Sequence, residues 1–188
     1  MNSWDDFIKE CSSCTRCVLH ESRKNVVIGR GDVKAASILF VGEGPGEQED
    51  IQGEAFVGRA GKLLDLVFEA LEIHQEDYYI ANVVKCRPPN NRIPTKTEMD
   101  ACMPWLRHQV KAIHPSIIVC LGSIAAKAII DPDAKITKIR GDWVEKSDKF
   151  AIMPTYHPAA ILRDVRKRDE FYLDIKKVRD RLRLLKAN

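Results

Sequence analysis

Residues 37–50 read SILFVGEGPGEQED, an apolar run that ends in a glycine-rich acidic loop. Similar apolar runs follow at residues 78–84, 116–121 and 150–155, and helical patterns lie between and after them at about residues 59–73, 97–113, 122–130 and 168–186. Parallel strands buried on both faces have such nearly continuous apolar runs, and their alternation with helices indicates βαβ units. The sequence therefore predicts an α/β fold, a three-layer α/β/α sandwich around a four-stranded, parallel, doubly wound sheet.

The composition fits an ordinary globular protein, with 188 residues of which 45% are hydrophobic and 30% are charged. No apolar run approaches the roughly 18 to 20 residues that a membrane span needs, and the amino end, MNSWDDFIKE, lacks the basic and apolar regions of a signal peptide. We therefore expect one soluble domain over residues 1–188, a cytoplasmic location and no membrane partner.

The net charge of +3 is small, but its distribution is uneven. From Arg163 to the end of the chain there are ten basic and five acidic residues. A basic carboxyl end suits contact with a polyanion, and it equally suits a solvated amphipathic helix.

Six cysteines lie at positions 11, 14, 17, 86, 102 and 120. Cys14 and Cys17 have the two-residue gap that lets thiolates converge on one metal centre, and Cys86 and Cys102 lie beside loop or cap signals. Cys120 lies inside an apolar run and is expected in the core. The pattern predicts a metal site.

Unusual polar residues follow three of the predicted strands: the loop from Gly42 to Asp50, then Asn82, then His157. In parallel α/β sheets the ligand binds outside the carboxyl ends of the strands, so these groups should meet in one crevice. The loop is not a phosphate cradle, because Pro45 removes a backbone N–H and four carboxylates would repel an anion. Gly42 and Gly44 suit close approach to a flat neutral ligand or a water; a tight surface turn is the alternative.

Three side chains of this crevice each have a functional and a structural interpretation. The Asn82 amide offers the donor and acceptor that read a nucleobase edge, or it satisfies a neighbouring loop. His157 can donate to an oxygen that gains negative charge, or it packs as a neutral side chain. Phe56, between glycines, is a stacking platform for a base, or a core residue.

Together, the segments GEGPGEQED, GEAFVGRAGKLLD, YYIANVVKCRPPNNRIPTKTE, RGDW and TYHPAAILR resemble the family 4 uracil-DNA glycosylases, which carry an iron–sulfur cluster. The resemblance runs from about Cys14 to the last predicted helix. It implies the fold of the uracil-DNA glycosylase superfamily, with the amino-terminal segment stapled by the cluster. It also implies a base-excision repair enzyme that flips uracil out of DNA and hydrolyses its N-glycosidic bond, leaving an abasic site.

The same resemblance implies a [4Fe–4S] cluster held by Cys14, Cys17, Cys86 and Cys102. Spacing alone would equally suit zinc, and a pairing of Cys11 with Cys14 is an alternative ligand choice.

For the pocket, the resemblance implies that Phe56 stacks on uracil and Asn82 binds its N3 and O4 edge. Glu49 crowds C5 and excludes the methyl group of thymine, and His157 donates to O2. Glu43 orients the attacking water or stabilises the sugar cation. Gly44 stands where other branches of the superfamily carry Asp or Asn, and it has no side chain to activate water. The general base of the reaction is therefore Glu43, a backbone group, or absent.

Contacts to single- or double-stranded uracil-containing DNA are expected around the pocket. Ile161 and Leu162 are candidate wedges, Arg163 is a candidate phosphate contact, and Lys85, Arg87 and Arg92 extend this surface near the cysteines. Residues 88–94 contain no histidine that could bond covalently to the DNA product, so we expect ordinary turnover. We also expect the protein to be a monomer. The rival hypotheses are a non-catalytic, metal-stapled DNA-binding module and an enzyme acting on free nucleotides.

Overall fold

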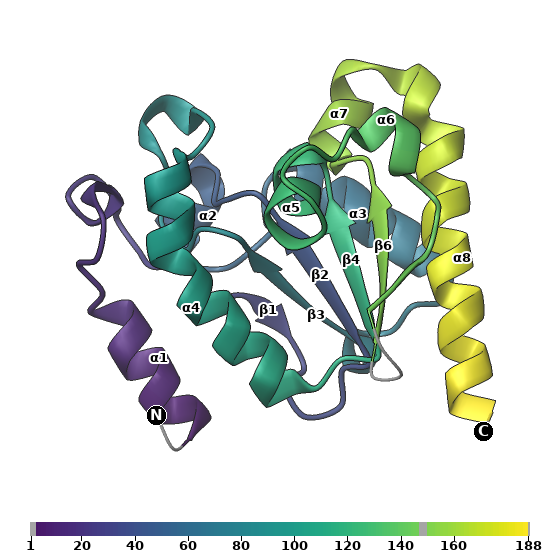
Figure 1. The fold of residues 1–188 in the computed structure, drawn as a ribbon, viewed down its shortest axis with the longest axis horizontal. Helices are drawn as coiled ribbons and strands as arrows, with labels where there is room; N and C mark the ends of the chain where they lie inside the picture. Colours follow the sequence, from purple (N-terminus) through teal and green to yellow (C-terminus); the bar gives the residue numbers. More distant parts are fainter. Residues whose placement is uncertain (1–2, 147–149, 188) are drawn as a thin grey trace.

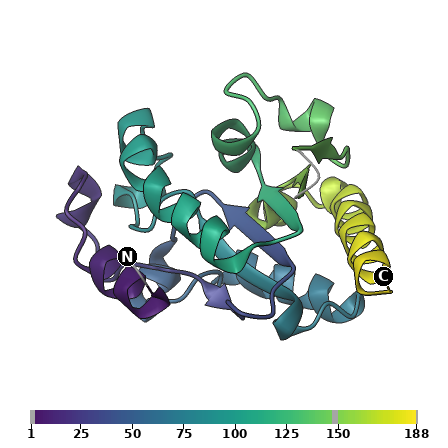
Figure 2. The ribbon, with the colours of Figure 1, turned by 60° about the horizontal axis from the view of Figure 1, so that its bottom comes forward.

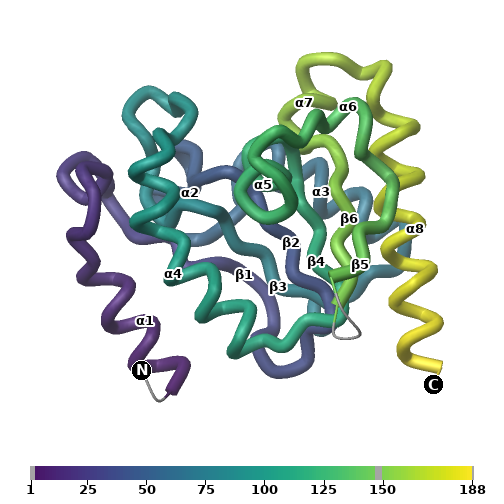
Figure 3. Tube along the Cα trace, in the orientation of Figure 1, coloured from purple at the N-terminus to yellow at the C-terminus, as the bar shows by residue number. Residues whose placement is uncertain are grey.

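The computed structural model describes residues 3–146 and 150–187, which form a mixed sheet between two layers of helices (Figure 1). The sheet has six strands in the order β1-β3-β2-β4-β6-β5. Its four central strands are parallel to one another: β3 (Tyr78–Asn82), β2 (Ile38–Gly42), β4 (Ile117–Leu121) and β6 (Ala151–Thr155). The edge strands β1 (Arg30–Gly31) and β5 (Val144–Glu145) run antiparallel to their neighbours (Figure 3).

The four predicted apolar runs coincide with the central strands, which are buried along their whole length. The prediction of a four-stranded sheet misses the two edges, and the sheet as a whole is not purely parallel. Each edge strand has only two residues and is partly or wholly exposed, so neither leaves an apolar run in the sequence.

Alternate side chains of each central strand pack against opposite helical layers. Leu39 and Val41 face α1 (Trp4–Ser12), α4 (Lys96–Ile113) and α5 (Ser123–Ile129), while Ile38 and Phe40 face α3 (Arg59–Ala70), α7 (Pro158–Arg163) and α8 (Arg168–Ala187). Figures 1 and 2 show the sheet between these layers. The three-layer arrangement expected from the sequence is therefore present in the described part of the chain.

The longest internal helix, α4, begins where the sequence predicts. Thr95 and Glu98 form a capping box, because the Thr95 hydroxyl accepts from the Glu98 N–H and the Glu98 carboxylate accepts from the Thr95 N–H. The helix continues through Pro104. Shorter helices not resolved by the sequence pattern complete the chain: α2 (Glu47–Gln52), α6 (Ile136–Ile139) and 3-10 turns at Val18–His20, Gln75–Asp77, Pro89–Asn91 and Val165–Lys167.

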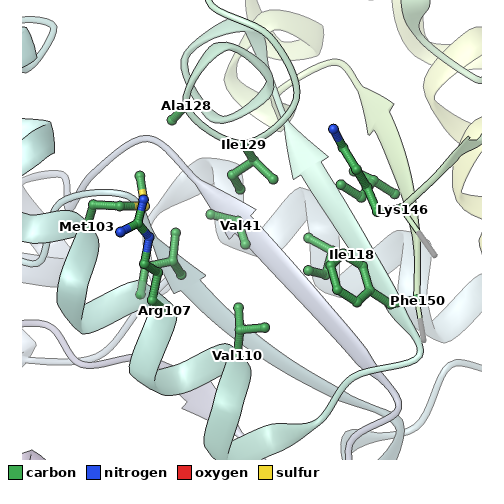
Figure 4. A pocket seen from close by; sticks show the side chains of 11 residues that line it. Val41, Met103, Arg107, Val110, Ile118, Ala128, Ile129, Lys146 and Phe150 are labelled. Carbon is green, nitrogen blue, oxygen red and sulfur yellow. The ribbon is translucent and has the colours of Figure 1, made fainter. Parts of the chain in front are cut away.

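Between α4 and α5 one face of the sheet has an apolar hollow of about 330 Å³ (Figure 4). Val41, Val110, Ile118 and further apolar side chains line it, and two cations, Arg107 and Lys146, lie on its opposite sides. Among the helices of the described residues, none is both long and apolar enough to cross a membrane.

The carboxyl-terminal helix is fixed to the end of β6 by one buried carboxylate. Asp174 of α8 is fully buried, accepts a 2.7 Å hydrogen bond from the Thr155 hydroxyl, and pairs with both Nε and Nη2 of Arg140. Because Thr155 is two residues before His157, this network fixes the short segment that leads from β6 into α7.

We predict that Asp174→Ala lowers the free energy of unfolding by about 3 to 5 kcal/mol, because it leaves the Arg140 guanidinium without its buried partner. Urea unfolding of the purified variant measures this. Asp180→Ala is the matched control on the same helix: its carboxylate pairs with Lys176 at 3.0 Å but is 47% exposed, so the loss should stay below about 1 kcal/mol. Equal losses in the two variants would contradict this role for Asp174.

Candidate active site

The loops that follow the central strands enclose a cleft of about 730 Å³. Figure 1 shows α2, α5 and α7, which begin just after β2, β4 and β6, around this end of the sheet. The cleft brings together most of the predicted pocket residues: Glu43, Gly44, Glu49, Phe56, Asn82 and His157. It combines apolar walls with polar groups from several loops, as small-molecule sites do, whereas the only polar side chains that line the hollow beside α4, among the described residues, are Arg107 and Lys146.

Asn82 ends β3 and is 2% exposed. Its Oδ1 atom is buried and has no hydrogen-bond partner within the described structure. A buried acceptor without a partner costs about 1 to 3 kcal/mol, so it is normally kept only where a ligand or an ordered water supplies the donor. The Asn82 side chain is thus arranged to accept a hydrogen bond from something that enters the cleft.

Phe56 forms one wall of this pocket and is held in an unusual backbone conformation. Its φ is 56°, in the left-handed region that non-glycine residues seldom adopt, and its ring lies 5.5 Å from that of His157. Two glycines make room for it. A Cβ on Gly61 would lie 1.7 Å from the Phe56 carbonyl oxygen, and a Cβ on Gly42 would lie 2.8 Å from the ring and 2.4 Å from Asn82 Oδ1.

Gly42 therefore keeps the gap between an aromatic face and an amide edge open. Such a gap fits a flat heterocycle that stacks on one side and forms hydrogen bonds in its own plane.

His157 precedes α7 and caps it, since its Nδ1 accepts from the Ala159 N–H at 3.1 Å. Burial, aided by the positive charge of Arg163, lowers the pKa of His157 to about 4. At neutral pH the imidazole is therefore uncharged, and because Nδ1 accepts, the proton is on Nε2. The local helix thus fixes a neutral Nε2–H donor at the cleft.

Two carboxylates, those of Glu43 and Glu49, also line the cleft. Burial raises the pKa of Glu43, and the charge of Arg163 acts in the opposite direction. Glu49 is held by the Gly58 N–H, which donates to its Oε1 at 2.8 Å. One carboxylate thus binds its proton more tightly than an exposed glutamate does, and the other is held in place by a backbone N–H.

Beside this cleft, five cysteines line a second, narrow hollow: Cys11, Cys14, Cys17, Cys86 and Cys102. Three of the sulfurs accept N–H hydrogen bonds of 3.3 Å: Cys14 from the Trp105 indole, Cys86 from Arg23 and Cys102 from the Lys85 backbone. N–H groups directed at sulfur stabilise thiolate ligands and are typical of iron–sulfur sites. Cys120 is buried away from this hollow, in the core, as predicted.

Among the described residues, no three His, Cys, Asp or Glu side chains have an arrangement that could hold a single metal ion. Five thiols around one narrow hollow are nonetheless the donor set that a zinc ion or an iron–sulfur group takes.

The residues predicted to contact DNA differ in exposure. Leu162 is 45% exposed, and Arg163 lies at the rim of the cleft. Ile161 is 5% exposed and packs in the core, so its burial does not suit a wedge. Arg92 reaches the cleft but holds Glu98 through both terminal nitrogens, and Arg87 donates to Asn91.

Lys85 is wrong as a surface contact, because it is 1% exposed and its ammonium is directed into the protein. Burial lowers its pKa to about 8, against the opposing effect of negative charge on neighbouring cysteines. The sequence did not predict the burial of Lys85, and it did not predict the sulfur contacts of Trp105 and Arg23. The only signal for Lys85 was its position between the strand that ends at Asn82 and Cys86.

Gly122 was also missed. It follows β4 with a φ of +93°, and a Cβ there would lie 2.9 Å from the Cβ of His157. A glycine directly after an apolar run is a usable signal for such a close approach.

Comparisons with known proteins identify the family of this chain. The sequence model of the uracil DNA glycosylase superfamily matches residues 28–180. A type-4 uracil-DNA glycosylase of Archaeoglobus fulgidus is 44% identical over 185 residues, which is 95% of this chain and 92% of that protein. Another, of Thermotoga maritima, is 48% identical over 152 residues, or 80% of this chain and 79% of that protein. A third, of Sulfurisphaera tokodaii, is 44% identical over 188 residues, with 96% and 85% covered.

The superfamily match covers most of the chain, and these relatives align with at least four fifths of it. The chain therefore belongs to the uracil-DNA glycosylase superfamily and, within it, to the type-4 uracil-DNA glycosylases.

Proposed function

We propose that the protein is a DNA repair enzyme that binds uracil flipped out of DNA and hydrolyses the bond between the base and deoxyribose. The observation that carries this is the buried, unpartnered Oδ1 of Asn82 beside the ring of Phe56. Uracil has an N3–H donor next to its O4 acceptor, so it meets Oδ1 and Nδ2 of one amide. Cytosine has an acceptor at N3 and a donor at N4, which this orientation of the amide opposes.

The remaining pocket groups suit the other edges of the base. Glu49, fixed by Gly58, would crowd C5 and exclude the methyl group of thymine. Phe56 would stack on the ring.

Bond cleavage makes the sugar cation-like and places negative charge on O2 of the departing uracil. A neutral His157 that donates from Nε2 stabilises that charge, and such preorganised donors are worth roughly 3 to 4 kcal/mol. Glu43, when ionised, would stabilise the sugar cation or orient the attacking water. A non-catalytic binding module would not need a neutral donor and an open acceptor in one pocket.

The cysteines that line the narrow hollow are the observation in favour of a [4Fe–4S] cluster. Its proposed ligands are Cys14, Cys17, Cys86 and Cys102. The cluster would supply a structural staple between the amino-terminal segment and the chain that follows Asn82, with no redox step in hydrolysis. In this proposal residues 1–188 act as one domain. A cytoplasmic, nucleoid-associated location and a monomeric state stay predictions.

The DNA surface would lie around the mouth of the cleft. Leu162 is exposed on α7 and would enter the gap left by the flipped base, and Arg163 would contact a phosphate. Both single- and double-stranded DNA are proposed substrates.

The first prediction concerns base release from a uracil-containing oligonucleotide by protein purified without air. Asn82→Ala and His157→Ala should each slow release by about 10² to 10³-fold, because each removes one preorganised contact to the base. Matched oligonucleotides with thymine or cytosine should release no base. No uracil release by the unaltered protein with an intact visible spectrum would refute the proposed function.

The pH dependence separates the roles of Glu43 and His157. Since the pKa of Glu43 is raised above its ordinary value of 4.5, its active carboxylate form is lost early as the pH falls, and kcat/KM should fall with it. His157 stays neutral down to about pH 4 and cannot cause that decline. Profiles of kcat/KM from pH 4.5 to 9 for the unaltered protein and Glu43→Gln measure this; an acid decline that persists in Glu43→Gln would contradict it.

A cysteine series tests the cluster ligands. Serine at position 14, 17, 86 or 102 should lower the iron content and the visible absorption, because each variant loses one thiolate ligand. Cys11→Ser and Cys120→Ser serve as buried controls that should keep both. Loss of iron in Cys11→Ser, with iron retained in Cys17→Ser, would instead support the pairing of Cys11 with Cys14.

A further inference from the structure

Lys85 is among the largest fully buried side chains of the protein, and the proposed mechanism does not use it. It lies three residues after Asn82 and one residue before Cys86, in the short segment between the uracil pocket and the cysteine hollow. It also lines that hollow. A buried ammonium is costly, so its partners indicate what it is kept for.

The ammonium is held from two sides. Lys85 Nζ donates to the backbone carbonyl of Asn82 at 2.6 Å and to Oε1 of Gln109 on α4. Gln109 is itself fixed, because its Nε2 donates to the Ile28 carbonyl at 2.8 Å. At its other end, the Lys85 backbone N–H donates to Cys102 Sγ. One residue thus contacts both the strand end that carries Asn82 and a predicted cluster ligand.

The charge of this ammonium is not balanced by a carboxylate. Its two hydrogen-bond acceptors are neutral amide oxygens, and none of the ion pairs found in the described structure includes it. Lys85 lines the same narrow hollow as Cys11, Cys86 and Cys102, whose sulfurs become thiolates when they bind a metal centre. A [4Fe–4S] group held by four thiolates carries a net negative charge, so it would supply the missing countercharge.

We propose that Lys85 is a positioning residue that couples the cysteine centre to uracil recognition. Its ammonium is the counter-ion of the thiolate-bound cluster, and its hydrogen bond to the Asn82 carbonyl holds the base-reading amide in place. Lys85 does not touch the substrate. The proposal rests on the function proposed above, and it assigns the cluster site a second effect besides stapling the chain.

The test uses Lys85→Met, which keeps the length of the side chain but removes its charge and its hydrogen bonds. Removal of a neighbouring positive charge disfavours addition of an electron, so the reduction potential of the cluster should shift to more negative values. The KM for uracil-containing DNA should rise about tenfold with a smaller change in kcat, because Asn82 holds the base both before and during bond cleavage. Redox titration of the visible spectrum and steady-state kinetics measure the two effects.

Lys111→Met is the matched control, since Lys111 is an exposed lysine on the same helix as Gln109. It should leave the potential and KM unchanged. The reduction potential of the cluster is measured without DNA. If the unaltered protein released no uracil, the proposed function would be refuted, but the measured effect of Lys85→Met on the potential would still stand. A Lys85→Met protein with the potential of the unaltered protein, or with its KM, would overturn the proposal.

A second variant decides the question if Lys85→Met does not fold. Gln109→Glu keeps the shape of the side chain and places a carboxylate against the same ammonium. This carboxylate neutralises the positive charge that Lys85 otherwise presents to the sulfurs. It should also shift the potential to more negative values and raise KM. An unchanged potential in folded Gln109→Glu would equally overturn the role assigned to Lys85.

Discussion

The parallel register between β2 and β3 is the constraint on which the active site depends. It pairs Gly42 with Asn82 at the carboxyl ends of the two strands. The pairing continues beyond the strands, where the Val83 N–H donates to the Gly42 carbonyl and the Val84 N–H to that of Glu43. A glycine that must have no side chain thus lies next to an asparagine that must keep an open acceptor. A shift of one residue would place a side chain in the base pocket.

The other half of the pocket depends on the end of β6 and on the helix that follows it. Thr155, the last residue of the strand, is tied to Asp174 of α8, and two residues later His157 caps α7. The cap makes Nδ1 an acceptor, and burial keeps the ring neutral. The chemistry of His157 is therefore a property of its local backbone and of its packing as much as of its residue type.

The sequence was sufficient to predict the central strands, the layer order and the meeting of Glu43, Asn82 and His157 in one cleft, because buried parallel strands leave continuous apolar runs and unusual polar residues follow their carboxyl ends. It did not predict the edge strands, which bury too little to leave a pattern. It also did not predict the burial of Lys85 and Ile161, which depends on packing against α4 and α3, respectively. A lysine beside cysteines in a sequence suggests a basic surface, and only three-dimensional packing shows the ammonium directed inward.

The account rests most directly on the proposal that Asn82 Oδ1 accepts from N3–H of the base. We would measure kcat/KM for oligonucleotides that carry deoxyuridine or its N3-methyl derivative, with the unaltered protein and with Asn82→Ala. The account predicts that the unaltered protein prefers deoxyuridine by about 10²-fold or more and that most of this preference disappears in Asn82→Ala. An equal preference in both proteins would show that Asn82 does not read that edge, and would contradict the account.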